Sequence, residues 1–309
     1  MPAQRRKPKL RKKVKSGYSK RLFKLFFLLF VIITFIYWIT SSKYFNSRHK
    51  LSVAVNQKDS DVVIVTFDPE LGEIYTITIP ANTQINLSRQ LGVWKAGKIW
   101  QLGKNEGYKG SLLAESLTKY FKFPIYVWAD SGFLDYLENN PLKLISALFK
   151  YLDTNLVIGD RIRLAFFSLR TRNSKRVNID LKDTSYLKKE ELVSGEEGFI
   201  KTETVPNEMV IIFSEPNIAK KNLKAIIYNT TSQNQTAEEI GEILELIGVK
   251  VASILKKDEE IETDCLIYSK DNDVEEIFAK LFACEISEKP MENKFDIEIK
   301  LGKKFADRF

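Results

Sequence analysis

Side chains that commonly catalyse reactions are scarce in this chain. His49 is the only histidine among 309 residues, which leaves almost no material for a Ser/His/Asp or Cys/His pair and excludes a histidine-rich zinc site. Asp271 and Asp273 are close neighbours, but they fall at the start of a helical pattern, where carboxylates favour the positive end of the helix dipole. We therefore assign no catalytic residue from the sequence.

The two cysteines, Cys265 and Cys284, are too few for a four-thiolate metal site or a disulfide-built scaffold. Cys265 opens an expected strand and Cys284 closes the helix that returns along it, so both are expected at one end of a domain. A disulfide between them could form outside the cell. Two separate buried thiols are the alternative that the sequence favours.

Two tryptophans, Trp94 and Trp100, lie in the glycine-rich stretch Asn82–Glu106, which has no sustained hydrophobic period. We predict a long surface loop here, and long loops in compact domains are often functional. These tryptophans could line a groove for a lipid or a glycan, or they could pack in the core. For Trp128, on an expected strand, the core is favoured.

The net charge of +8 is concentrated at the N-terminus. Residues 1–24 hold 11 of the 48 Lys and Arg and none of the 40 Asp and Glu, so the rest of the chain carries 37 basic residues against 40 acidic ones. Read alone, this tail could bind RNA or anionic lipid. Its position beside an apolar stretch favours a role in membrane topology, and we expect no nucleic-acid partner.

The apolar stretch after the tail predicts a transmembrane anchor over residues 25–41. Counted from Leu22, it approaches the roughly 20 residues that a spanning helix needs, and Tyr37 and Trp38 lie where an aromatic belt is expected. The basic tail then places the N-terminus in the cytoplasm and the rest of this single-pass chain outside the cell membrane. A cleavable signal peptide is the alternative, but no small-x-small cleavage site follows.

Hydrophobic periodicity predicts a layered α/β domain over residues 51–205, after a short polar stalk at Lys43–Lys50. The buried pattern of Asp61–Asp68 and the alternation of Glu73–Pro80 indicate a β-hairpin. Strand and helix patterns then alternate, which is typical of α/β layers. The further expected elements are helices at Ser111–Phe121, Ser131–Asn139, 140–152 and 158–170 and strands at Phe123–Asp130 and Arg176–Thr184.

A proline-containing linker at residues 206–222 precedes a smaller C-terminal domain, residues 223–309. Its elements follow the order β-α-β-β-α-β, which is the split βαβ pattern of ferredoxin-like folds. The expected strands are Leu223–Asn229, Val249–Leu255, Asp264–Ser269 and Phe295–Gly302, and the expected helices are Thr236–Gly248 and Asp273–Phe282.

The C-terminal block resembles the LytR C-terminal domain. AIIYNTT at Ala225–Thr231 stands where that family has a strand ending in Asn-Gly-Thr-Gly, and GEILELIGVKV at Gly241–Val251 matches its helix, glycine and second strand. FDIEIKLGKKFA at Phe295–Ala306 matches its closing strand and Leu-Gly-x-x-[Phe/Tyr]-Ala ending.

The preceding part is similar to the LytR-CpsA-Psr domain. DSDVVIVTFDPELGEIYTITIPANT at Asp59–Thr83 keeps the hairpin and the Ile-Pro frame of that family's signature. It is a degenerate copy, because Asp59 replaces the first arginine and Ala81 and Asn82 replace an Arg-Asp pair. The resemblance implies a bacterial cell-envelope protein of a family that transfers glycopolymers from a polyprenyl pyrophosphate carrier to the cell wall.

This resemblance also implies what a transferase site would need. A pyrophosphate requires arginines and a carboxylate-held divalent ion. Only Asp61 stands at a matching position, as a candidate ligand for Mg²⁺ or as a solvated carboxylate at a strand start. A substitute anion site, or more simply a charged helix face, could come from arginines further along the chain, namely Arg161, Arg163, Arg170 and Arg172.

The sequence thus favours a membrane-anchored, non-catalytic envelope protein that binds or scaffolds wall glycopolymer or partner proteins and needs no cofactor. A divergent glycopolymer transferase, which would use Mg²⁺, is the alternative. A regulator acting through the cytoplasmic tail is a third hypothesis.

Overall fold

The computed structural model describes residues 22–30, 33–34, 41–57, 60–192, 195–231, 233–257, 264–288 and 294–309. Residues 22–30 are helical, and large apolar side chains along them are exposed. Within the described ranges, no helix combines the length and the apolar character that crossing a membrane requires. The basic tail up to residue 21, and residues 31–32 and 35–40 of the predicted anchor, lie outside these ranges.

The first domain is built on a five-stranded sheet in the order β6-β1-β2-β3-β7. β2 is antiparallel to both β1 and β3, whereas β6 runs parallel to β1 and β7 parallel to β3. Four strands therefore end at the edge of the sheet where β2 begins. The bounds are β1 Leu51–Asn56, β2 Val62–Asp68, β3 Glu73–Ile79, β6 Val127–Asp130 and β7 Arg176–Asp180.

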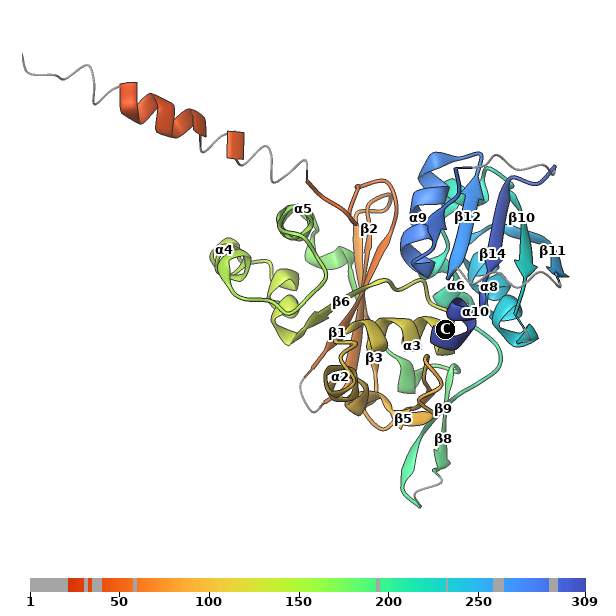
Figure 1. Ribbon diagram of the computed structural model, residues 1–309. Coiled ribbons are helices and arrows are strands. Elements are labelled where there is room, and N and C mark those ends of the chain that lie inside the picture. Colours follow the sequence, from red (N-terminus) through yellow and green to blue (C-terminus); the bar gives the residue numbers. More distant parts are fainter. Residues whose placement is uncertain are drawn as a thin grey trace, which may run out of the picture.

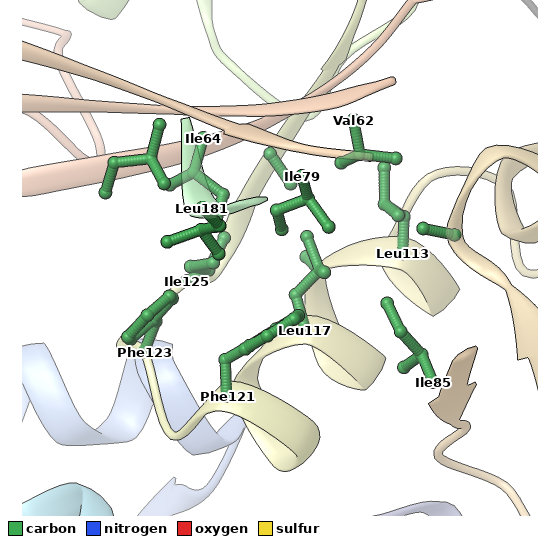
Figure 2. Close-up of a cluster of buried hydrophobic side chains, with 14 of the residues drawn as sticks. Val62, Ile64, Ile79, Ile85, Leu113, Leu117, Phe121, Phe123, Ile125 and Leu181 are labelled. Carbon is green, nitrogen blue, oxygen red and sulfur yellow. The ribbon is translucent and has the colours of Figure 1, made fainter. Parts of the chain in front are cut away.

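Helices cover both faces of this sheet (Figure 1). β1 and β2 are buried along their whole lengths, as expected for strands covered on two sides. One face packs against α2 and α3, and Figure 2 shows Leu113 and Leu117 of α3 facing Val62 and Ile79 of the sheet. The other face packs against η1, α4 and α5. The bounds are α2 Ala96–Asn105, α3 Ser111–Phe121, η1 Ser131–Leu137, α4 Pro141–Phe149 and α5 Ile158–Arg170.

The prediction of one long loop over Asn82–Glu106 is wrong. This stretch contains the strand pair β4 (Gln84–Asn86) and β5 (Val93–Lys95) and then helix α2. Gly103 lowers the helix propensity of this stretch, which is why the sequence did not indicate a helix. Glycine is needed here for packing, because a Cβ at this position would lie 2.2 Å from the Lys109 carbonyl oxygen.

The segment expected to be a stalk, Lys43–Lys50, is docked against the first domain. The buried Asp160 of α5 accepts hydrogen bonds through Oδ1 from four donors, the Ser42 hydroxyl (2.6 Å) and the backbone amides of residues 43, 44 and 45 (2.9–3.0 Å). Phe45 is buried against the sheet. A single carboxylate thus fixes where the N-terminal segment meets the domain, and the β1 strand that follows was not predicted.

A second five-stranded sheet, in the order β11-β10-β14-β12-β13, forms the C-terminal domain. The predicted split βαβ topology is wrong, because β10 pairs directly and in parallel with β11. Cys265 and Cys284 are joined by a disulfide, where the sequence favoured separate thiols. The bounds are β10 Lys224–Asn229, α8 Asn234–Ile247, β11 Lys250–Lys256, β12 Cys265–Ser269, α9 Asn272–Phe282, β13 Glu285–Ile286, β14 Ile297–Leu301 and α10 Lys303–Arg308.

Residues 206–222, predicted as a linker, form two short helices, α6 (Asn207–Phe213) and α7 (Pro216–Ala219). Apolar residues of α6 are buried in the core of the first domain. Between the helices, the Glu215 carboxylate accepts a hydrogen bond from the Lys50 amide (2.6 Å). The segment is therefore packed into the protein. The elements before it are η2 Asn173–Lys175, η3 Leu181–Asp183, β8 Leu187–Glu191 and β9 Glu197–Lys201.

Asp160→Ala should release the segment around residues 41–45. The substitution leaves partly buried backbone amides without an acceptor, and we expect the free energy of unfolding to fall by about 3 kcal/mol. Urea denaturation and limited proteolysis check this, with the exposed Asp183→Ala as the control. Wild-type resistance to cleavage within residues 41–50 of the variant would contradict the docking role.

Candidate functional site

A cavity of about 380 Å³ opens at the edge of the first sheet where β1 and β6 end. Asn56 closes β1 and Asp130 closes β6, and the parallel pairing of these strands brings the two residues together as register partners. Helix α2 forms another wall of the cavity. The lining residues that could contact a ligand are Asn56, Trp100, Gln101, Lys104, Lys150 and Tyr151.

The Asp130 carboxylate accepts hydrogen bonds from two backbone amides. Its Oδ1 accepts a hydrogen bond from the Gly132 amide (2.9 Å) and its Oδ2 accepts one from the Asp153 amide (3.0 Å). The residue thus caps η1 and fixes the loop before α5. Both oxygens are engaged, so the carboxylate holds the floor of the cavity in shape.

Aromatic rings form one side of the cavity. Trp100 on α2 packs edge-to-face against Trp128 of β6, with ring centroids 5.7 Å apart. The rings leave no room for a side chain at Gly110, where a Cβ would lie within 2.5 Å of both. Tyr151, at 84% exposure, also lines the cavity. Trp100 is thus a core residue that also lines a cavity, whereas Trp128 packs in the core as favoured.

The two lysines at the rim are each balanced by a carboxylate. Lys104 Nζ lies 3.2 Å from Asp153 Oδ2 and 5.5 Å from the Trp100 ring centroid. Lys150 Nζ lies 3.1 Å from Asp135 Oδ2. The rim is accordingly polar but close to neutral, which suits hydroxyl and amide groups better than a concentrated double negative charge.

Asp61 is held by the loop that follows β3. Its Oδ1 accepts a hydrogen bond from the Ala81 amide (2.8 Å). The first amides of α2 donate back into the same loop, Ala96 to the Thr83 carbonyl (2.8 Å) and Gly97 to the Ala81 carbonyl (3.0 Å). A helix start that could have bound an anion is therefore partly used by the protein itself.

Asp61 is the candidate Mg²⁺ ligand that the sequence offers, and its neighbours bear on that prediction. Within the described ranges, no group of three or more His, Cys, Asp and Glu side chains is placed to hold a metal ion. Lys182 is a basic residue whose charge is coupled to Asp61. Its pKa is raised above the usual value, first because its ammonium group donates a hydrogen bond to Asp180, and then because the carboxylates of Asp183 and Asp61 attract its charge.

The candidate arginines do not converge on Asp61. Arg161 donates through one guanidinium nitrogen to the carbonyl oxygens of Ala147 (2.9 Å), Leu148 (3.1 Å) and Lys150 (2.9 Å), and so caps the end of α4. Its Nε donates to the Tyr136 hydroxyl (2.8 Å). Burial raises the pKa of Tyr136, and this hydrogen bond from Arg161 opposes the shift.

The other arginines of this region also lie with α5 and the segment after it. Arg163 and Arg170 line a second cavity, and Arg163 donates a hydrogen bond to the Phe45 carbonyl oxygen (3.2 Å) at its wall. Arg172 is exposed next to η2. Arg176 donates to the carbonyl oxygens of Leu137 and Ser168, and burial lowers its pKa. These side chains belong to the face of the sheet opposite α2, as Figure 1 shows for α5.

Sequence reasoning missed Asn56, Gln101, Lys150 and Tyr151 as cavity residues. The glycine-rich composition around Trp100 was the signal that drew attention to this part of the chain. The loop before α5 gave no such signal, because only tertiary pairing brings Tyr151 to the end of β6.

No family model and no curated protein matches the chain. Among solved structures, Bacillus subtilis TagV is similar at 12% identity, covering 50% of this chain and 92% of that chain, with a TM-score of 0.37. Bacillus subtilis TagT is similar at 13% identity, over 68% and 95%, with a TM-score of 0.39. A LytR-CPS2A-psr family protein, YwtF (TagT) with bound octaprenyl pyrophosphate lipid, is similar at 15% identity, over 52% and 88%, with a TM-score of 0.35. TM-scores below 0.5 do not establish a shared site or function.

Arg161→Met should lower stability and leave ligand binding unchanged. The substitution removes the hydrogen bonds to the carbonyl oxygens at the end of α4, and we expect a loss of about 2 to 3 kcal/mol in the free energy of unfolding. Urea denaturation measures this, with the exposed Arg172→Met as a matched control that should change little. If stability is unchanged while affinity for a phosphate ligand falls, Arg161 is an anion-binding residue instead.

Proposed function

We propose that this chain is a membrane-anchored protein of the bacterial cell envelope that binds wall glycopolymer without transferring it. Residues 25–41 would form the anchor, with the basic tail in the cytoplasm and the two α/β domains outside. The apolar composition of that stretch and the position of the charge support this topology. The motif resemblance to LytR-CpsA-Psr and LytR C-terminal domains supports a place in the envelope.

The cavity beside α2 is the proposed binding site. Sugar rings present apolar C–H faces and many hydroxyl groups, and an aromatic wall with amide groups meets both. Trp100 and Tyr151 supply the rings, and Asn56 and Gln101 supply amides. Among the described residues we find no hydrogen-bond partner for the Asn56 side chain, which is 7% exposed at the cavity floor. We propose that its amide meets a ligand hydroxyl there.

A single observation argues most strongly against transfer chemistry. Arg161 is the arginine nearest in sequence to the cavity-lining loop at Lys150 and Tyr151. It uses two of its guanidinium nitrogens, Nε and Nη2, in hydrogen bonds to the Tyr136 hydroxyl and to backbone carbonyls. A departing pyrophosphate needs positive charge directed at its oxygens. The rim offers two lysines, and each is already paired with an aspartate.

Binding to purified wall glycopolymer tests the proposal. The full chain in detergent should retain the polymer, and Tyr151→Ala should weaken Kd roughly fivefold, corresponding to about 1 kcal/mol for one lost aromatic contact. Tyr108→Ala is the matched control, because Tyr108 is also a partly exposed tyrosine and lies outside the cavity.

Two results would contradict this assignment. Equal binding by Tyr151→Ala and wild type would remove the cavity as the site. Covalent attachment of polymer to a wall acceptor, with release of the prenyl carrier, would favour the transferase alternative.

A further inference from the structure

Helix α4 carries apolar residues on two faces, and one of these faces is uncovered. Leu144 and Ala147 are buried against the sheet, whereas Leu142, Ile145 and Phe149 are 78%, 53% and 82% exposed. These exposed residues are spaced three and four apart, so they share one side of the helix. A helix that is apolar all round normally has a covering partner.

Helix α5 extends this exposed apolar face and adds positive charge. Phe166 on α5 is 46% exposed, and α5 packs beside α4. Phe166 also lines the second cavity, of about 380 Å³, together with Phe45, Arg163 and Arg170. We call the exposed residues Leu142, Ile145, Phe149 and Phe166, together with Arg163 and Arg170, the α4/α5 face.

The chain itself brings this face close to its apolar N-terminal segment. Residues 42–45 are fixed to α5 by the Asp160 carboxylate. Ser42 lies eight positions after the helical Thr34, which limits the distance between their Cα atoms to about 28 Å. Figure 1 shows α4 and α5 on the side of the first sheet from which the N-terminal helix approaches.

We propose that the α4/α5 face rests on the outer surface of an anionic lipid bilayer. The apolar side chains of α4 enter the boundary between headgroups and acyl chains, and the exposed Arg170 contacts a lipid phosphate. A guanidinium group next to aromatic side chains can bind a lipid phosphate while the rings contact the apolar part of the same lipid. The proposal rests on the membrane anchoring proposed above, and it adds a second contact that orients the first domain.

A lipid occupant fits better than a second copy of the chain. The face combines exposed aromatic and aliphatic side chains with basic ones, the composition typical of helices that lie in a membrane interface. It also lies within a short chain length of a segment whose own apolar side chains are exposed from Leu22 to Phe30. Both features point to the same apolar phase.

Fluorescence quenching in reconstituted vesicles tests this contact. The full chain is labelled with an environment-sensitive fluorophore through Phe149→Cys and placed in vesicles of anionic phosphatidylglycerol that contain lipids with a quencher on the upper acyl chain. We expect severalfold stronger quenching at residue 149 than at the control Val93→Cys. Val93 is a 59% exposed apolar residue on β5, away from α4. Both native cysteines are in the disulfide and do not take the label.

A charge variant tests the arginine contribution. Arg170→Gln should lower the ratio of docked to undocked protein about fivefold, the change expected for one basic residue near an anionic surface. The control Lys188→Gln removes a positive charge from β8 and should leave the ratio unchanged. In zwitterionic phosphatidylcholine vesicles the two variants should behave alike.

The outcomes separate this inference from the proposed function. Extraction at alkaline pH reports on the anchor independently of the label. If the chain stays in the membrane but quenching at residue 149 equals that at residue 93, the docking proposal is overturned and the anchor stands. If the label self-quenches as protein density rises and lipid quenching is absent, the occupant is a second copy, which also overturns it. Loss of the chain on extraction would overturn both proposals.

Discussion

Hydrogen bonds between charged side chains and the backbone determine which charged groups of this protein remain available to bind a ligand. The Asp160 carboxylate accepts hydrogen bonds from the amides of residues 43–45, and the Asp130 carboxylate accepts them from the amides of residues 132 and 153. Arg161 caps the end of α4 through three carbonyl oxygens. Such charge-assisted bonds are stronger than neutral ones, so the groups that make them are held in place and are less available to a ligand.

The two faces of the first sheet consequently differ in character. Beside α2, the cavity has aromatic walls, amide side chains and lysines that are neutralised by neighbouring aspartates. On the opposite side, α4 and α5 present exposed apolar residues together with the exposed Arg170. The first surface suits a neutral, hydroxyl-rich chain and the second suits an interface with charged phosphates and apolar tails. Docking the second surface on a bilayer would set the height of the cavity above it.

Local sequence patterns predicted several individual helices and strands, but they failed where tertiary contacts determine the structure. The hairpin around residues 61–80 and helix α3 follow directly from hydrophobic period. Helix α2 was not predicted because Gly103 lowers its helix propensity. The glycine is required because the Lys109 backbone lies close to this position. The order of elements in the C-terminal domain could not reveal that β10 and β11 are neighbours, since the order alone does not specify pairing. Asp61 and the arginines could be identified from the sequence as candidate site residues, but their hydrogen bonds to the backbone depend on the tertiary structure.

Titration calorimetry with a short prenyl diphosphate tests the non-catalytic account most directly. The full chain is titrated with and without Mg²⁺ and compared with Asp61→Asn. The account predicts that any binding is independent of Mg²⁺ and unchanged by Asp61→Asn, because Asp61 is engaged with the Ala81 amide and the arginines lie elsewhere. Tight binding that requires Mg²⁺ and disappears in Asp61→Asn would contradict it.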